Sequence, residues 1–200
     1  MMIFLKLVKN SIILLLFFSI TSCRSQGNYK LLDKELDYCI IERVKQEIKL
    51  NFVDKETFTL TDFSNRIEKL LIENKLLRDK SKESYKRLFL SLQGKTYNND
   101  NYKLFTTKVK KDSDYDVLKN SISVHNTPFE CNRFLIDKNG LSTNSELSEY
   151  YSLLTSYFEN GTVSDDWELN QKILKSIPKN LFNNINYRLP IIVLIYDNIE

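Results

Sequence analysis

Apolar residues recur at every third or fourth position through much of the chain, which is the spacing of one face of an α-helix. The clearest case runs from Tyr29 to Leu50, where charged residues fill the positions between the apolar ones. The same spacing, with the capping residues, predicts further helices over residues 62–78, 81–93, 114–124, 127–139, 143–158 and 165–176. We therefore expect a chain that is mainly helical.

Several boundaries of these helices are predicted from single residues. Gly94 and Gly140 each follow an apolar pattern, as C-terminal capping glycines do, and Leu141 is placed for the apolar contact of a Schellman motif. The sequence Thr-Pro-Phe-Glu at 127–130 combines a capping box with a proline suited to the first helical position. A helix is therefore expected to begin there.

Two segments lack the helical pattern. Residues 95–109 place turn-forming residues between β-prone ones, which predicts a small hairpin, and residues 57–60 suggest a short extended piece. The run from Leu189 to Tyr196 is continuously apolar and β-branched, which predicts a buried strand that begins near Pro190. The expected fold class is therefore α+β, predominantly helical, with one globular domain over residues 29–200.

The first 22 residues have the layout of an export signal. Lys6 and Lys9 precede an apolar run from Ile12 to Phe18, and no acidic residue occurs before Asp33. The apolar region is about ten residues long, well short of the ~20 that a membrane-spanning helix needs. We therefore expect a segment that is removed during export.

The segment Ile20-Thr21-Ser22-Cys23 resembles the lipobox of bacterial lipoproteins. The resemblance implies a signal peptide at residues 1–22, diacylglycerol attached to the Cys23 sulfur and a short tether over residues 23–28. It also implies a cell-envelope protein held in the membrane by its acyl chains, and Arg24 after the cysteine points to the periplasmic side of the outer membrane more than to the inner membrane. The alternative is an uncleaved signal anchor formed by residues 1–22.

Charge and glycine content exclude several function classes. Once the segment with Lys6 and Lys9 is removed, basic and acidic side chains almost balance, so no electrostatic footprint for nucleic acid remains. The chain has only 4 glycines, and no phosphate-binding or dinucleotide-binding loop can be drawn from them. We therefore expect no nucleic acid, no nucleotide and no cofactor.

Two cysteines remain beyond Cys23. In an oxidising envelope Cys39 and Cys131 can form a disulfide that closes a loop of about 90 residues. The alternative is two buried free thiols, since cysteine is among the most buried residue types. The sequence leaves both interpretations open.

Candidate catalytic and metal-binding residues are few. His125 is the single histidine, so a zinc site with two histidines is excluded; it either acts as a base beside Ser121 or Ser123 or lies at a helix end. The acidic run at 112–116 opens like a calcium loop but lacks the glycine and glutamate that complete one. The carboxylate pairs Asp33/Asp37 and Glu146/Glu149 fit solvated helix faces better than a glycosidase site.

Aromatic residues crowd one predicted helix and its neighbour: Tyr150, Tyr151, Tyr157 and, further on, Trp167. Tyrosine and tryptophan are favoured at protein interfaces, so these residues are a candidate partner-binding patch, with core packing as the alternative. The first functional hypothesis is therefore a lipid-anchored envelope protein that binds another envelope protein or a small ligand. The second is a small envelope hydrolase that uses carboxylates or His125 with a serine.

Overall fold

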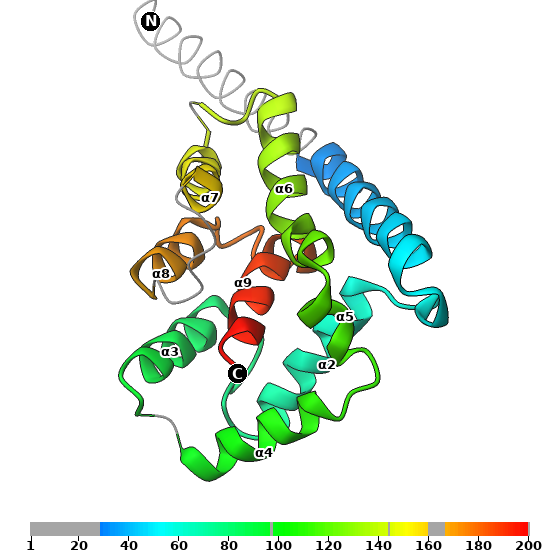
Figure 1. The fold of residues 1–200 in the computed structure, drawn as a ribbon. Helices are drawn as coiled ribbons and strands as arrows, with labels where there is room; N and C mark the ends of the chain where they lie inside the picture. The colour runs from blue at the N-terminus through cyan, green and yellow to red at the C-terminus, as the bar shows by residue number, and fades with distance from the viewer. Residues whose placement is uncertain (1–28, 97, 144, 160–166, 200) are drawn as a thin grey trace, which may run out of the picture.

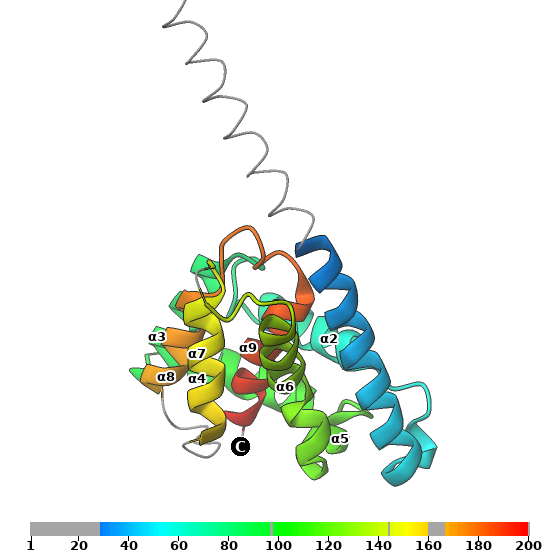
Figure 2. The ribbon, with the colours of Figure 1, turned by 90° about the horizontal axis from the view of Figure 1, so that it is seen from above.

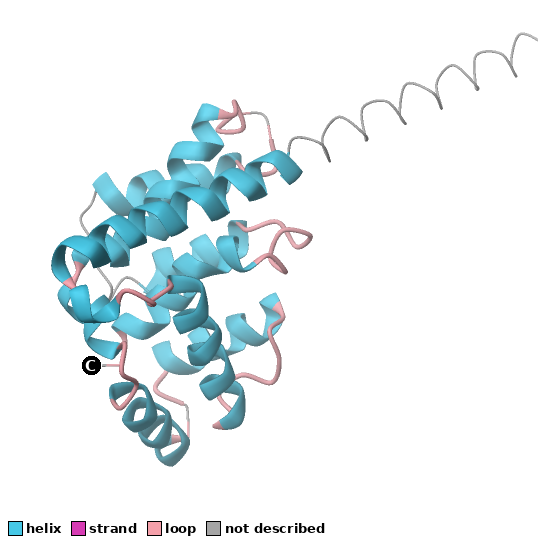
Figure 3. Cartoon of the chain, turned by 90° about the vertical axis from the view of Figure 1, so that its right-hand side faces the viewer, coloured by secondary structure: helices cyan, strands magenta, loops and turns pink. Residues whose placement is uncertain are grey.

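Helices form the framework of the molecule (Figures 1 and 3). The computed structural model describes residues 29–96, 98–143, 145–159 and 167–199. An N-terminal helix covers residues 29–51. The elements that follow are η1 (Val53–Lys55), α2 (Leu60–Glu73), α3 (Lys82–Gln93), α4 (Asn99–Lys110), α5 (Tyr115–Asn120), α6 (Ile122–Lys138), α7 (Ser148–Glu159), α8 (Trp167–Ser176) and α9 (Ile185–Asp197). These residues include no β-strand, so the expected α+β fold class is wrong and the fold is all-helical.

The segment predicted to be a buried C-terminal strand is helix α9. It packs against α2, α6 and α8, and it is buried on every side apart from its two ends. In Figure 2 it lies among the other helices, close to α6 and α7. A helix that is buried all round has no polar face, so its sequence shows no helical period and matches a buried strand equally well. Asn184 begins the helix, since its side chain accepts a hydrogen bond from the backbone N–H of Asn186.

Pro190 lies inside α9, where it leaves the carbonyl of Asn186 without its usual helical partner. The Nδ2 group of Asn132, on α6, donates to that carbonyl over 3.0 Å and to the carbonyl of Pro128 over 2.8 Å. Asn132 is fully buried, and its two bonds therefore satisfy a backbone group that the proline exposes. They also fix the position of α9 against α6.

The predicted hairpin over 95–109 is also wrong, because this segment contains α4. Asn98 caps the helix by accepting hydrogen bonds from the backbone N–H groups of Asp100 and Asn101, each at 3.0 Å. Phe105 and Val109, which suggested strand alternation, are four residues apart and both fully buried on one helix face. The extended piece expected at 57–60 forms no strand either.

The helix boundaries near residue 121 differ from those expected. Ser121 ends α5 and its side chain caps α6 by accepting from the backbone N–H of Val124, at 3.2 Å. The helix then continues through Pro128, so the expected start at Thr127 is wrong. The expected caps at Gly94 and Gly140 are confirmed; Gly140 has a φ of +67°, and Leu141 donates its N–H to the carbonyl of Ile136, as a Schellman motif requires.

The N-terminal helix buries one face, as its periodicity predicts. Its buried residues follow one another at intervals of four and are Leu32, Leu36, Ile40, Val44 and Ile48. Its opposite face carries the charged side chains. The helix runs along the outside of the molecule beside α6 (Figures 1 and 2).

Candidate functional site

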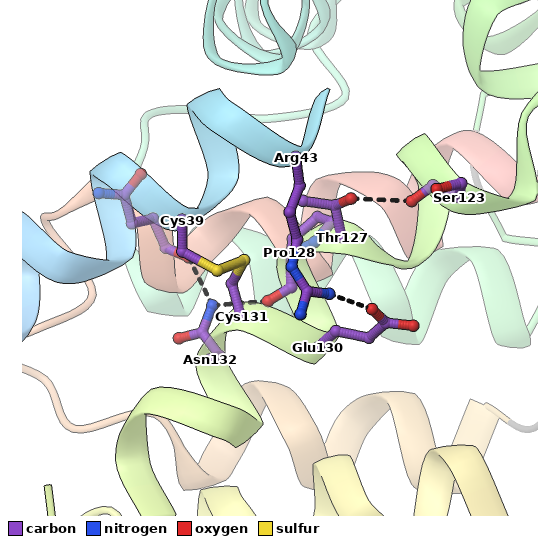
Figure 4. Close-up of a disulfide and its surroundings, with 9 residues drawn as sticks. Cys39, Arg43, Ser123, Thr127, Pro128, Glu130, Cys131 and Asn132 are labelled. Carbon is purple, nitrogen blue, oxygen red and sulfur yellow. Dashed lines mark hydrogen bonds and ion pairs between the residues drawn. A yellow bond between two sulfur atoms is a disulfide. The ribbon is translucent and has the colours of Figure 1, made fainter. Parts of the chain in front are cut away.

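Cys39 and Cys131 form a disulfide between the N-terminal helix and α6 (Figure 4). The S–S distance is 2.08 Å and the Cα atoms are 5.9 Å apart. The ion pair between Arg43 and Glu130 joins the same two helices next to it. We call this junction between the N-terminal helix and α6 the seam.

Further polar contacts close the seam towards the start of the N-terminal helix. Glu35 accepts hydrogen bonds from the Lys138 ammonium group, at 3.0 Å, and from Nδ2 of Asn139, at 2.8 Å. These bonds from Asn139 and Lys138 hold the pKa of Glu35 below its ordinary value. The disulfide of the seam thus has a polar contact on either side of it.

A groove of about 560 Å³ runs along the outer side of the seam. Two aromatic side chains line it from opposite helices, Tyr38 at 69% exposure and Phe134 at 54%. Large aromatic side chains that lie this exposed on either side of one groove are typical of a surface that binds a partner. We call this surface the seam groove.

The candidate aromatic patch of the sequence analysis lies mostly inside the molecule. Tyr150 and Tyr157 are buried in the core, and Tyr157 stacks on Phe129 with ring centroids 4.4 Å apart. Tyr151 and Trp167 are half-buried, and Trp167 packs edge-on against Phe89. Burial raises the pKa of the Tyr150 hydroxyl far above its ordinary value. The structure therefore does not gather these four side chains into one exposed surface.

His125 is paired with Asp197 rather than with a serine. Its Nε2 lies 2.8 Å from both carboxylate oxygens of Asp197, and its Nδ1 lies 3.1 Å from Oδ1 of Asn126. Burial opposes the charged imidazolium, but the hydrogen bonds and the charge of Asp197, with the bond to Asn126, raise the pKa of His125 above its ordinary value. The pair joins the end of α9 to α6. Both ring nitrogens are taken, and the Ser121 hydroxyl donates instead to Glu47.

The acidic candidates do not converge on one site. Asp112 and Asp114 both accept hydrogen bonds from the Arg66 guanidinium group, and the Lys55 ammonium group lies 3.8 Å from Asp114, so two acids of the run that resembled a calcium loop are paired with cations. Of the two carboxylate pairs, Asp37 and Glu149 lie on exposed helix faces and Glu146 is exposed in the turn before α7. Asp33 is half-buried on the N-terminal helix. In the part of the chain that the structure describes, no cluster of three or more metal-binding side chains occurs, and no helix is long and apolar enough to cross a membrane.

A buried ion pair between Glu68 and Arg188 was not predicted from the sequence. The Glu68 carboxylate is fully buried and accepts hydrogen bonds from Arg188, at 3.0 Å, from the Tyr85 hydroxyl, at 2.5 Å, and from Lys80, at 2.6 Å. Burial raises the pKa of Glu68, but these three donors outweigh it and the pKa is lowered. The one available signal was Arg188 itself, a charge next to the apolar run from Leu189 to Ile195 of α9.

The fold and its seam define an all-helical protein with a covalent link between two of its helices and an aromatic-lined groove beside that link. Comparison with known proteins adds no relative. The chain matches no family model, and neither the curated proteins nor the solved structures contain a significant match to it.

Proposed function

We propose that the protein is a lipid-anchored component of a bacterial cell envelope that binds a partner protein through the seam groove. The observation that carries this proposal is the segment Ile20-Thr21-Ser22-Cys23, which follows a basic and then apolar stretch in the order that lipoprotein signals have. The disulfide supports it, because such bonds persist in oxidising compartments and are rare in the cytosol.

The tether keeps the folded domain near the membrane. Only the segment 24–28 separates Cys23 from the first described helix, a distance of about 17 Å when fully extended at ~3.3 Å per residue. Two or three acyl chains on one cysteine hold a protein far more firmly than a single chain, whose attachment is marginal. A partner that the seam groove meets is therefore itself an envelope protein.

Replacing the modified residue tests the anchor. We expect Cys23→Ala to leave the chain without acyl groups and to move it out of the membrane fraction, because the thiol is the atom that carries the lipid. Fractionation of cell envelopes and the mass of the N-terminal peptide measure this. Ser25→Ala is the matched control and is expected to stay in the membrane. Unchanged fractionation of Cys23→Ala, with no acyl mass on the wild-type peptide, contradicts the anchor.

Site-specific crosslinking tests the partner. A photoreactive benzophenone amino acid in place of Tyr38 is expected to yield one discrete adduct in intact cells, which mass spectrometry identifies. The same amino acid in place of Leu104, which is 51% exposed on α4, serves as the control and is expected to yield none. Phe134→Ala is expected to reduce the yield at position 38, because it removes the opposite wall of the groove. Equal adducts at both positions, or none, contradict binding at the seam groove and leave the anchor unaffected.

A further inference from the structure

A second hollow, formed by residues that lie away from the seam in sequence, has four lysines among its lining residues. Its volume is about 610 Å³, and it lies between the start of α3, the end of α8 and the segment that leads into α9. Lys82, Lys86, Lys175 and Lys179 surround it, and Phe182 forms part of its wall. We call it the lysine cavity.

The positive charge of the lysine cavity is not neutralised by the described residues that line it. The ammonium groups of Lys86, Lys175 and Lys179 form no ion pair or hydrogen bond with a described residue. The one carboxylate on its wall, Glu83, is shared with Arg87, 3.7 Å away on the next turn of α3. The lining residues therefore include four lysines and one partly engaged acid, and such a cavity favours an anion.

Lys82 is fixed in place by the protein. Its ammonium group donates to the backbone carbonyls of Lys175, at 2.6 Å, and Ile177, which leaves one of its three N–H donors for a ligand. Burial lowers the pKa of Lys82, and the nearby charge of Glu149 opposes this only in part. An anion in the cavity would compensate the cost of burying this charge. A donor held in position also loses little side-chain freedom when a ligand binds.

The dimensions of the cavity indicate more than a simple inorganic ion. Small-molecule sites have volumes of about 300–1,000 Å³, and a phosphate group alone would leave most of this space empty. Phe182 and Leu174 add apolar surface beside the lysines. The ligand that fits has an anionic group for the lysines and a carbon skeleton for the apolar wall.

We propose that the lysine cavity binds the phosphate group of an organic phosphate, either in a phospholipid headgroup or in a free phosphate ester. Lysine binds phosphate as a point charge, and several lysines around one cavity suit the diffuse charge of that group. In Figure 2 the segment between α8 and α9 lies at the same end of the molecule as the start of the N-terminal helix. Binding of a phospholipid headgroup rests on the proposed lipid anchor, which would hold that end of the molecule near the bilayer. Binding of a free phosphate ester does not depend on the anchor.

Calorimetric titration of the full chain in a neutral detergent tests the proposal. One arm uses glycerol 3-phosphate, and the other uses dihexanoyl phosphatidylglycerol, with dihexanoyl phosphatidylcholine as its uncharged control. We expect the Lys86→Ala/Lys179→Ala variant to bind the probe at least tenfold more weakly than the wild type. The Lys103→Ala/Lys110→Ala variant removes the same charge from the exposed face of α4 and is expected to bind like the wild type.

Each arm identifies one source of the phosphate. Binding of glycerol 3-phosphate that is lost in the cavity variant supports a free ester, and cavity-dependent binding of phosphatidylglycerol alone supports the headgroup. No binding of either probe, or equal losses in the two double variants, overturns the proposal. The Cys23→Ala chain keeps the cavity, so its titration separates a failure of the cavity from a failure of the anchor.

Discussion

Reduction of the Cys39–Cys131 disulfide is expected to lower the free energy of unfolding by about 4–5 kcal/mol. The bond joins residues separated by 92 positions, and a crosslink over so long a loop removes many conformations from the unfolded chain. In the folded chain the N-terminal helix still has its buried apolar face and the Arg43–Glu130 contact. We therefore expect reduction to weaken the fold without rearranging it.

Denaturant unfolding of the full chain, with and without a phosphine reductant, measures this difference on one sequence. The use of reductant avoids the cavity that a substitution at the fully buried Cys131 would create. The Cys39→Ala/Cys131→Ala variant is the control, and its unfolding midpoint is expected to be insensitive to the reductant. Two outcomes contradict the prediction: an unchanged midpoint in the wild type, or alkylation of both thiols in the native protein before reduction.

Sequence patterns located several of the helices that have one apolar face, among them the N-terminal helix. Helix α3 is a further example, because Ser81 and Gly94 act within a few residues of the ends that they set. The pattern failed at α9 for a physical reason. The apolar run is the same whether neighbours surround a helix or a strand, and burial on all sides comes from α2, α6 and α8, which the local sequence does not reveal.

Pro190 and Pro128 misled the prediction in a related way. Each residue was assigned to the beginning of an element, but each lies inside a helix. A proline is tolerated there when another group satisfies the carbonyl that it leaves free, and for Pro190 that group is the Asn132 side chain, far away in the sequence. Compensation of this kind depends on tertiary contacts, so no local pattern predicts it.

The candidate site was predictable in its chemistry but not in its position. The number of cysteines indicated that a Cys39–Cys131 disulfide could form. The clustering of aromatic residues, in contrast, suggested a binding patch that includes Tyr150 and Tyr157, which are buried. The exposed aromatic residues Tyr38 and Phe134 lie on separate helices, and only the packing of the seam brings them to one groove. Interfaces are recognised by exposure, which composition alone does not report.

Loss of the Glu68 charge is expected to destabilise the protein by about 3–5 kcal/mol. The carboxylate is fully buried and holds Arg188, and Glu68→Gln leaves that guanidinium buried without its counter-charge. The pair also joins α2 to α9, while the remaining donors of Arg188 bind the carbonyls of Phe182 and Asn183, each at 2.7 Å. Glu73→Gln, which removes a carboxylate from an exposed pair on the same helix, is expected to change stability by less than about 1 kcal/mol.

Replacing both residues of the ion pair tests whether the loss of stability in Glu68→Gln comes from the unpaired charge of Arg188. We expect the Glu68→Leu/Arg188→Met variant to be considerably more stable than Glu68→Gln, because neither side chain is then left as an unpaired buried charge. Urea unfolding of the wild type, the single variant and the double variant measures this. A Glu68→Gln midpoint equal to that of the wild type contradicts a stabilising role for the buried pair.

The pH dependence of the unfolding free energy provides a second test of the role of the Glu68 charge. Because the folded-state pKa of Glu68 lies below its ordinary value of 4.5, its contribution to stability is present above that value and is lost as pH falls through the folded-state pKa. The difference in unfolding free energy between the wild type and Glu68→Gln should therefore be constant near neutral pH and shrink below about pH 4.5. A difference that persists undiminished in acid would show that the substitution acts through packing, and the charge of Glu68 would then have no part in holding α2 to α9.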